Sequence, residues 1–303
     1  MKHRLNSGFE SIQTAAPGVA FLYLLFLIAL GLTIASILNF TIIALFWRLS
    51  PAQVSEMMAN PALNGNKAML MLSQALTSLG VFVLPALVFL KLRNNPVVSH
   101  TGSFGVFAAA LSIIIMVLQA PLIDFTAALN QGLDVSGFLP GLQQWMVNSE
   151  AEAKLLTDSF LNMHSGSDLF VALVVMALIP ALGEELLFRA GIQSLLLQAI
   201  RNKHVAIWLT AFLFSFIHFQ FFGFLPRFLL GALLGYLFTE GGSVVYAIVA
   251  HFTNNALAVL SAFPAFAVKQ MPNWFSGLPA AIASAFLAVA GVFLLRRMRS
   301  RGV

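Results

Sequence analysis

Long apolar stretches recur along this chain, and they constrain its fold more than any other feature. About 20 consecutive apolar residues form a helix long enough to cross a bilayer. Only 9% of the residues are charged, far below the fraction of a typical soluble domain. We therefore predict an all-α, polytopic membrane protein with about eight transmembrane helices, over residues 18–47, 68–91, 104–129, 168–200, 204–222, 225–240, 243–263 and 277–296.

The distribution of basic residues predicts the orientation. With eight spans and a cytoplasmic amino terminus, the cytoplasmic side collects Lys2, Arg4, Lys91, Arg93, Arg201, Lys203, Arg296, Arg297, Arg299 and Arg301. The external side receives Arg48, Lys67, Lys154, Arg227 and Lys269. Because Lys and Arg concentrate in cytoplasmic loops, we expect a multi-pass integral membrane protein with both termini in the cytoplasm, and in the cytoplasmic membrane if the source is prokaryotic.

The chain shows no internal repeat and no linker, so residues 1–303 are interpreted as one integral membrane domain. The one sizeable external segment is 130–167, in which Leu142–Leu161 is amphipathic enough to lie on the membrane surface as a helix. Ser165–Asp168 has the character of a helix cap. The absence of cysteine excludes disulfides and thiolate chemistry. The few basic residues lie beside apolar segments, which favours the lipid bilayer as a partner and argues against nucleic acid.

Three charged residues lie inside the apolar segment 168–200. Each charge costs roughly 3 kcal/mol at the centre of a membrane helix, so such residues are expected to pair or to line a polar cavity. Glu185 and Arg189 are four residues apart and can form an ion pair along the helix. Glu184 is rotated about 100° from Glu185 and is therefore expected to face a neighbouring helix. Gly183 lets another helix approach closely.

Two later apolar segments carry His218, and His251 with Asn255, which share one helical face. Glu184, His218 and His251 match the ligand set of a catalytic zinc site, with three protein ligands and an open position for water. The same groups would also work without a metal, with a carboxylate taking a proton from water while a histidine and an amide donate to an oxyanion. Both alternatives, with Zn²⁺ and without it, stay open.

Two further polar residues receive a structural interpretation. Asn254 lies on a different helical face from Asn255 and is interpreted as a packing residue. Arg227 is interpreted as an anchor at the external interface, with a gate as the alternative.

The polar residues form an ordered series of motifs: Glu184-Glu185-x-x-x-Arg189, Phe214-x-x-x-His218 and His251-x-x-x-Asn255. This series resembles that of the CAAX prenyl endopeptidase family, also described as the CAAX protease and bacteriocin-processing (Abi) group, whose eukaryotic representative is the Ras-converting endopeptidase. The resemblance covers a core of residues 168–263 and implies an intramembrane protease with a catalytic cavity among its helices.

Carried over to this chain, the resemblance implies that Glu184 and His218 activate the attacking water. It implies that His251 and Asn255 stabilise the oxyanion, and that Glu185 and Arg189 hold the helix in position. Members of the family are commonly described as metalloproteases, although a glutamate-activated mechanism competes with that view.

The expected function is therefore an intramembrane endopeptidase that hydrolyses a membrane-anchored protein or peptide. We expect its cavity to open toward the boundary between membrane and cytoplasm, so that the substrate enters sideways. An ion-coupled transporter is one alternative, because intramembrane acids and histidines also build proton relays. A non-catalytic immunity or scaffold protein is the other.

Overall fold

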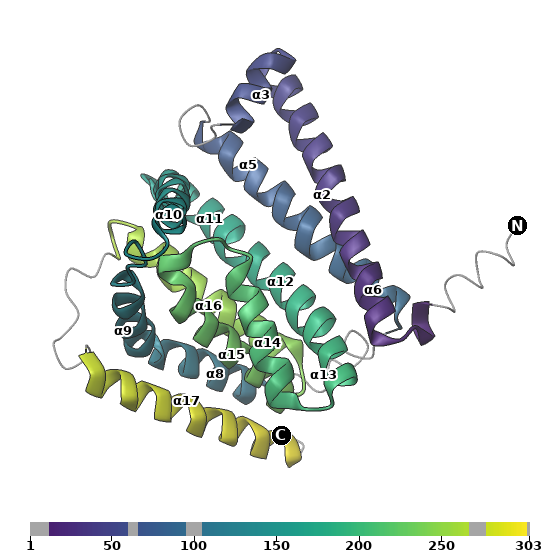
Figure 1. Cartoon of the computed structure of the whole chain (residues 1–303), viewed down its shortest axis with the longest axis vertical. Coiled ribbons are helices and arrows are strands. Elements are labelled where there is room, and N and C mark those ends of the chain that lie inside the picture. The colour runs from purple at the N-terminus through teal and green to yellow at the C-terminus, as the bar shows by residue number, and fades with distance from the viewer. Residues whose placement is uncertain (1–11, 60–65, 95–104, 267–276, 302–303) are drawn as a thin grey trace, which may run out of the picture.

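The computed structural model describes residues 12–59, 66–94, 105–266 and 277–301, and this part of the chain is all helical (Figure 1). The predicted fold class is thereby confirmed. The first helices are α2 (Pro17–Trp47), α3 (Pro51–Ala59), α5 (Lys67–Ser78), the π-helix η1 (Leu79–Val83), α6 (Leu84–Leu92), α8 (Val106–Leu118), α9 (Ala120–Gln131) and α10 (Pro140–Leu161).

The second half of the chain contains the motifs noted in the sequence. Its helices are α11 (Gly166–Ala172), the π-helix η2 (Leu173–Leu178), α12 (Ile179–Glu185), the π-helix η3 (Leu186–Gln193), α13 (Ser194–Ile200), α14 (Lys203–Phe216), the 3₁₀-helix η4 (Phe221–Gly223), α15 (Phe224–Gly241), α16 (Val244–Ala262) and α17 (Gly277–Ser300).

Seven helical segments of the described residues are long and apolar enough to cross a membrane. The difference from the eight predicted spans lies at 204–222, where α14 ends at Phe216. With 14 residues, this helix reaches roughly 21 Å, short of the ~30 Å hydrocarbon core. The predicted span is longer than α14 because the apolar run continues past the helix end into the turn that carries His218.

The long segment Gly166–Ile200 is one continuous helical rod with two π-helical stretches, on either side of Glu184 and Glu185. Pro180 lies just after the first stretch and has no N–H to donate to the preceding turn. π-Helical turns are rare and occur frequently at functional sites. At Gly183 an added Cβ would collide with Val83 and Phe82, so the close approach predicted for this glycine is confirmed and brings η1 against α12.

The helices pack in a sequence of neighbouring layers. α2 contacts α5, η1 and α6, and the rod from α11 to α13 packs against these helices. α16 lies against the rod and against α8, while α15 packs on α14, α9, α16 and α17 (Figure 1). The acidic pair on α12 therefore lies in the middle of the bundle, between α16 and the hairpin formed by α14 and α15.

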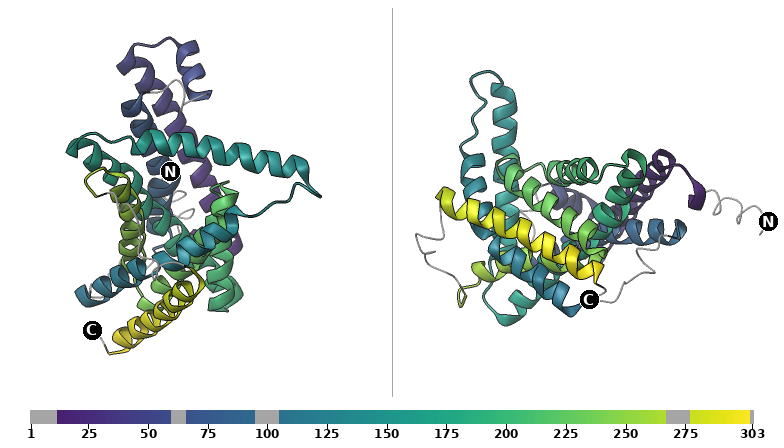
Figure 2. Two further views of the ribbon diagram at one scale, coloured as in Figure 1. Left: turned by 90° about the vertical axis from the view of Figure 1, so that its left-hand side faces the viewer. Right: turned by 90° about the horizontal axis from the view of Figure 1, so that it is seen from below.

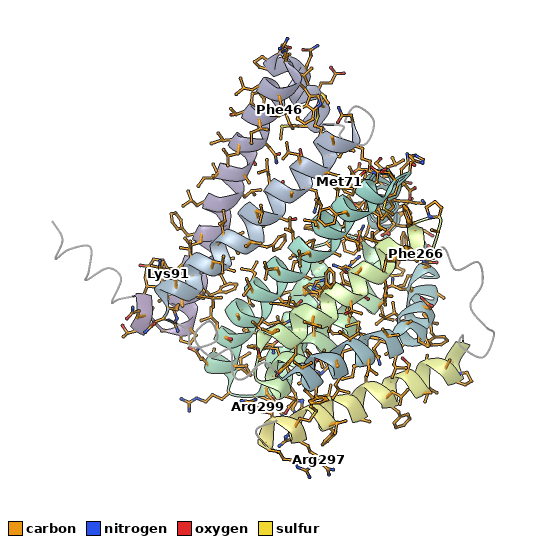
Figure 3. The ribbon with its side chains drawn as sticks, turned by 180° about the vertical axis from the view of Figure 1, so that it is seen from behind. Phe46, Met71, Lys91, Phe266, Arg297 and Arg299 are labelled. Atoms are coloured by element: carbon orange, nitrogen blue, oxygen red, sulfur yellow. The ribbon has the colours of Figure 1, made fainter. Side chains whose placement is uncertain are left out.

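Both described ends of the chain lie at the same end of the bundle. Arg93 at the end of α6 donates to the carbonyl of Ala15, before α2, and to Gln198 of α13. Arg299 near the end of α17 donates to the carbonyl of Thr239 in α15. The basic side chains Lys91, Arg297 and Arg299 gather at this end, whereas Phe46, Met71 and Phe266 lie toward the other (Figure 3).

The opposite end is crossed by α10, which runs across the bundle rather than along it (Figure 2). The predicted surface helix at Leu142–Leu161 is thus present as a helix. Its aromatic contacts are to the turn after α14: the ring of Trp145 lies 4.8 Å from that of Phe221 and 6.3 Å from that of Phe219. The predicted cap is also confirmed, because the Ser165 hydroxyl accepts from the backbone N–H of Asp168 at 3.1 Å.

Candidate active site

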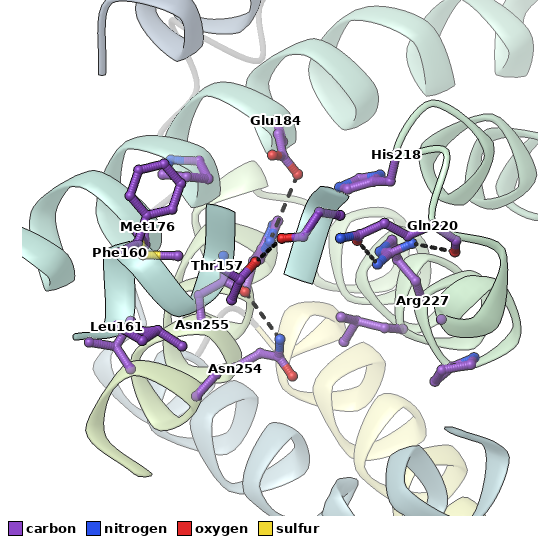
Figure 4. Close-up of a pocket in the computed structure, with 18 of the residues that line it drawn as sticks. Thr157, Phe160, Leu161, Met176, Glu184, His218, Gln220, Arg227, Asn254 and Asn255 are labelled. Carbon is purple, nitrogen blue, oxygen red and sulfur yellow. Dashed lines mark hydrogen bonds and ion pairs between the residues drawn. The ribbon is translucent and has the colours of Figure 1, made fainter. Parts of the chain in front are cut away.

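One cavity of about 610 Å³ collects the residues that the motifs singled out. Glu184, His218, His251 and Asn255 all line it, and they come from α12, the turn after α14, and α16 (Figure 4). Glu184 lies 18 residues after the start of the Gly166–Ile200 rod and 16 before its end, and so near its middle. Four residues from three separate chain segments therefore meet at one polar site inside the bundle.

Beneath the cavity, Glu185 and Arg189 form the predicted ion pair, with the Arg189 Nε 2.8 Å from the Glu185 carboxylate. Both side chains are fully buried. The second Glu185 oxygen accepts from Nδ1 of His251 at 2.9 Å. The pair therefore does more than hold its own helix in position, because it links α12 to α16 and orients a histidine of the site.

This contact leaves Nε2 of His251 on the cavity side. It lies 3.9 Å from the Glu184 carboxylate, so Glu184 faces a neighbouring helix as the sequence predicted. The distance is too long for a direct hydrogen bond, and a water molecule can bridge polar groups at such a separation. His251 thus lies between two carboxylates: Glu185 accepts a hydrogen bond from its Nδ1, and Glu184 lies beside its Nε2 in the cavity.

The orientation of His218 is set by a backbone carbonyl four residues earlier. Its Nδ1 donates to the carbonyl of Phe214 at 2.7 Å, which leaves the Nε2 lone pair available in the cavity. The Phe214 ring makes edge contacts with His218 at 5.2 Å and with His251 at 5.8 Å, and the guanidinium of Arg189 lies 5.3 Å from its centre. Phe214, with 1% of its surface exposed, is therefore the packing centre that sets the two imidazoles relative to each other.

The turn that carries His218 is fixed by hydrogen bonds from outside the motifs. The buried amide of Asn130 in α9 donates to the carbonyl of Phe221 and accepts from the N–H of Leu225. Ser215 donates to the carbonyl of Phe224 at 2.7 Å. Phe219 adopts a left-handed backbone conformation with φ of 52°. A tight, hydrogen-bonded turn thus takes the place of the last part of the helix that the apolar run predicted here.

The two asparagines of α16 act together. Asn254 also lines the cavity, so its interpretation as a packing residue is wrong. Its Nδ2 donates to the Oδ1 of Asn255 at 3.1 Å (Figure 4). Because the Asn255 oxygen is thereby engaged, its NH₂ group is left to donate into the cavity.

Arg227 is also a cavity residue, and its interpretation as an external anchor is wrong. Its guanidinium donates to the side-chain oxygen of Gln220 at 2.5 Å and to the Gln220 carbonyl at 3.4 Å (Figure 4). None of the ion pairs among the described residues joins a carboxylate to Arg227. The sequence signal was available, since Gln220 and Arg227 flank the same short turn.

The cavity lies on the α10 side of the bundle. Ala153, Leu156, Thr157, Phe160 and Leu161 of α10 form part of its wall. This is the end away from both described chain ends. Our two expectations, cytoplasmic termini and a cavity opening toward the cytoplasm, therefore conflict, because the fold puts the termini and the α10 wall at opposite ends.

The residues do not form an evident metal site. Among the described residues, no group of three His, Asp or Glu side chains is arranged so that it could hold a metal ion. Nδ1 of His251 donates to Glu185 and Nδ1 of His218 to a backbone carbonyl, which leaves Nε2 of each ring available, as in histidines that bind a metal. The zinc prediction for Glu184, His218 and His251 stays untested.

Residues 166–257 match the family model described as type II CAAX prenyl endopeptidase, Rce1-like. This segment, about a third of the chain, is similar to the Rce1-like family. The matched segment covers the helices from α11 into α16 and therefore contains all seven motif residues. The family is one of proteases, in agreement with the resemblance stated from the motifs. No curated protein and no solved structure matches the chain.

Proposed function

We propose that this protein is an intramembrane endopeptidase that hydrolyses a peptide bond of a membrane-associated protein or peptide. The observation that carries the proposal is the meeting of Glu184, His218, His251 and Asn255 in one cavity within an Rce1-like segment. The volume of this cavity lies within the roughly 300–1,000 Å³ that is usual for ligand pockets.

The proposed reaction begins with a water molecule near Glu184 and His218. The Glu184 carboxylate takes a proton from this water, with Nε2 of His218 as the second acceptor, while the water oxygen attacks the peptide carbonyl carbon. The NH₂ of Asn255 donates to the oxyanion that forms, and a doubly protonated His251 would donate from Nε2 while Nδ1 stays on Glu185. Collapse breaks the C–N bond, and the leaving amine takes back the proton from Glu184.

The two sides of the cavity differ in polarity, and this difference would orient a bound substrate. Phe160, Leu161 and Met176 form an apolar side, and Arg227 with Gln220 lies on the opposite side (Figure 4). An arginine without a carboxylate partner is suited to bind one from a ligand. We propose that Arg227 binds a carboxylate of the substrate, either the chain-terminal group or an acidic side chain downstream of the cleaved bond.

The test is cleavage by the purified protein in lipid vesicles, with a mixed peptide library and its own host membrane fraction as substrates. Products are identified by mass spectrometry for the wild type, Glu184→Gln and His218→Ala. Loss of a general base typically lowers the rate by about 10²–10⁴-fold, so both variants should lose their products. Glu152→Gln is the matched control, because this acid lies exposed on α10 and outside the cavity.

Products formed equally by the wild type and Glu184→Gln would contradict the proposed chemistry. Products that disappear in Glu152→Gln as well would show that any lost carboxylate disturbs the assay. A second series addresses zinc: chelator treatment of the wild type, followed by metal analysis of the purified protein, separates the two alternatives for the activation of water.

A further inference from the structure

A second cavity of about 530 Å³ lies on the other side of α15 from the candidate active site. α14 and α17 both pack on α15, and their side chains form the two walls of this groove, with Trp208 on α14 and Phe293 on α17. Apart from its mouth, it is lined mostly by apolar side chains. It belongs to no motif of the protease family match and plays no part in the proposed hydrolysis.

The groove has a length that fits one leaflet of a bilayer. Its lining extends along α15 from Glu240 to Leu229 and along α17 from Arg296 to Ala285. Each of these distances covers 11 residues, or roughly 16 Å of helix. Half of the ~30 Å hydrocarbon core has about the same thickness. An acyl chain in the groove would therefore extend from the membrane surface to about the bilayer centre.

The mouth of the groove carries an excess of positive charge. Lys203 Nζ lies 2.6 Å from one oxygen of Glu240, and Arg296 Nε lies 3.6 Å from the other. Two cations thus share one carboxylate, and 60% of the Arg296 side chain surface is exposed. His204 and Tyr236 are hydrogen-bonded to each other at the same mouth. The charge balance favours an anionic group at the surface end of the groove.

The groove is separate from the candidate active site. Between the two lies a third cavity of only about 20 Å³, which shares Leu229 and Leu233 with the groove and Pro226 and Leu230 with the active-site cavity. This volume holds about one water molecule. An alkyl chain in the groove therefore does not extend into the proteolytic cavity of this conformation.

We infer that the groove binds an anionic glycerophospholipid, with its phosphate at Lys203 and Arg296 and one acyl chain between α14 and α17. The bound lipid would support the hairpin of α14 and α15, whose turn carries His218. The proposal does not depend on the proposed protease activity, because it rests on a different cavity and on charges at the end of the bundle where both described chain ends lie.

The experiment is native mass spectrometry of the full-length protein released from nanodiscs that contain equal amounts of phosphatidylglycerol and phosphatidylcholine. The wild type should retain phosphatidylglycerol in preference to phosphatidylcholine. Each basic residue near an anionic membrane surface contributes a factor of about five in affinity, so Lys203→Gln/Arg296→Gln should lower this preference by roughly 30-fold. The matched control is Arg297→Gln/Arg301→Gln, which removes two exposed cations at the same end but outside the groove.

A second pair of variants tests the acyl chain. Ala285→Trp fills the groove from α17 without a change in charge and should abolish retention, whereas Ala283→Trp on the exposed face of the same helix should not. Equal retention of both lipids by the wild type would overturn the inference. Equal loss in the paired control, or full retention in Ala285→Trp, would show that the lipid binds by surface charge alone.

Discussion

Replacement of Arg189 by methionine removes the charge that compensates a fully buried carboxylate, and it should destabilise the protein strongly. Glu185 would keep its contact with His251 at 2.9 Å but lose the Arg189 Nε at 2.8 Å. Removing one partner of a buried pair typically costs about 3–5 kcal/mol, because the other charge stays buried. The guanidinium contact with the Phe214 ring at 5.3 Å is lost as well.

The assay is thermal unfolding of the purified protein in lipid or mild detergent. At about 2 °C per kcal/mol for a chain of this size, Arg189→Met should lower Tm by roughly 6–10 °C. Glu185→Gln/Arg189→Met should be less destabilised than the sum of its single variants, because no buried charge is left without its partner. The exposed Arg48→Met serves as the control and should change Tm little. A Tm for Arg189→Met equal to that of Arg48→Met would refute this reasoning.

Three further predictions concern the site and its placement. Asn255→Ala should lower the cleavage rate by about 10²–10³-fold with unchanged Tm. Asn254→Ala should lower the rate less, because Asn254 only orients its neighbour. Equal effects of the two variants in a rate assay would contradict these separate roles. The wild type should cleave a peptide with a free terminal carboxylate, or with a downstream acidic side chain, roughly 10-fold or more efficiently than its amide counterpart, as measured by kcat/KM on matched peptides. Arg227→Gln should lose this preference, whereas the exposed Lys154→Gln should keep it. Since the chain has no cysteine, single cysteines at Ser136 and Ser300 should react with an impermeant thiol reagent from opposite sides of sealed vesicles, and labelling of both from one side would refute the described topology.

Much of the site could be predicted because helical spacing is a local property. The four-residue separation in Glu185/Arg189 gave the ion pair, and the separation of about 100° between adjacent residues gave the different direction of Glu184. The meeting of these residues with His218 and Asn255 followed from the cost of isolated polar groups in a membrane. These inferences need only helix geometry and an apolar surrounding.

What the sequence did not predict depends on tertiary contacts. The bond from His251 to Glu185 joins residues 66 positions apart. The end of α14 is set by hydrogen bonds from Asn130, and hydropathy alone carries no sign of them. Asn254 and Arg227 were assigned to packing and to the interface because helical spacing says nothing about where a cavity wall or a tight turn lies.

Isotope incorporation tests most directly whether Glu184 activates water for peptide hydrolysis. A peptide cleaved by the wild type is incubated with the vesicle-bound protein in H₂¹⁸O, and the new carboxylate of the product is analysed by mass spectrometry. We expect one ¹⁸O atom in that carboxylate with the wild type and no product above background with Glu184→Gln. Labelled product formed at the same rate by Glu184→Gln, or product without the label from the wild type, would contradict this expectation.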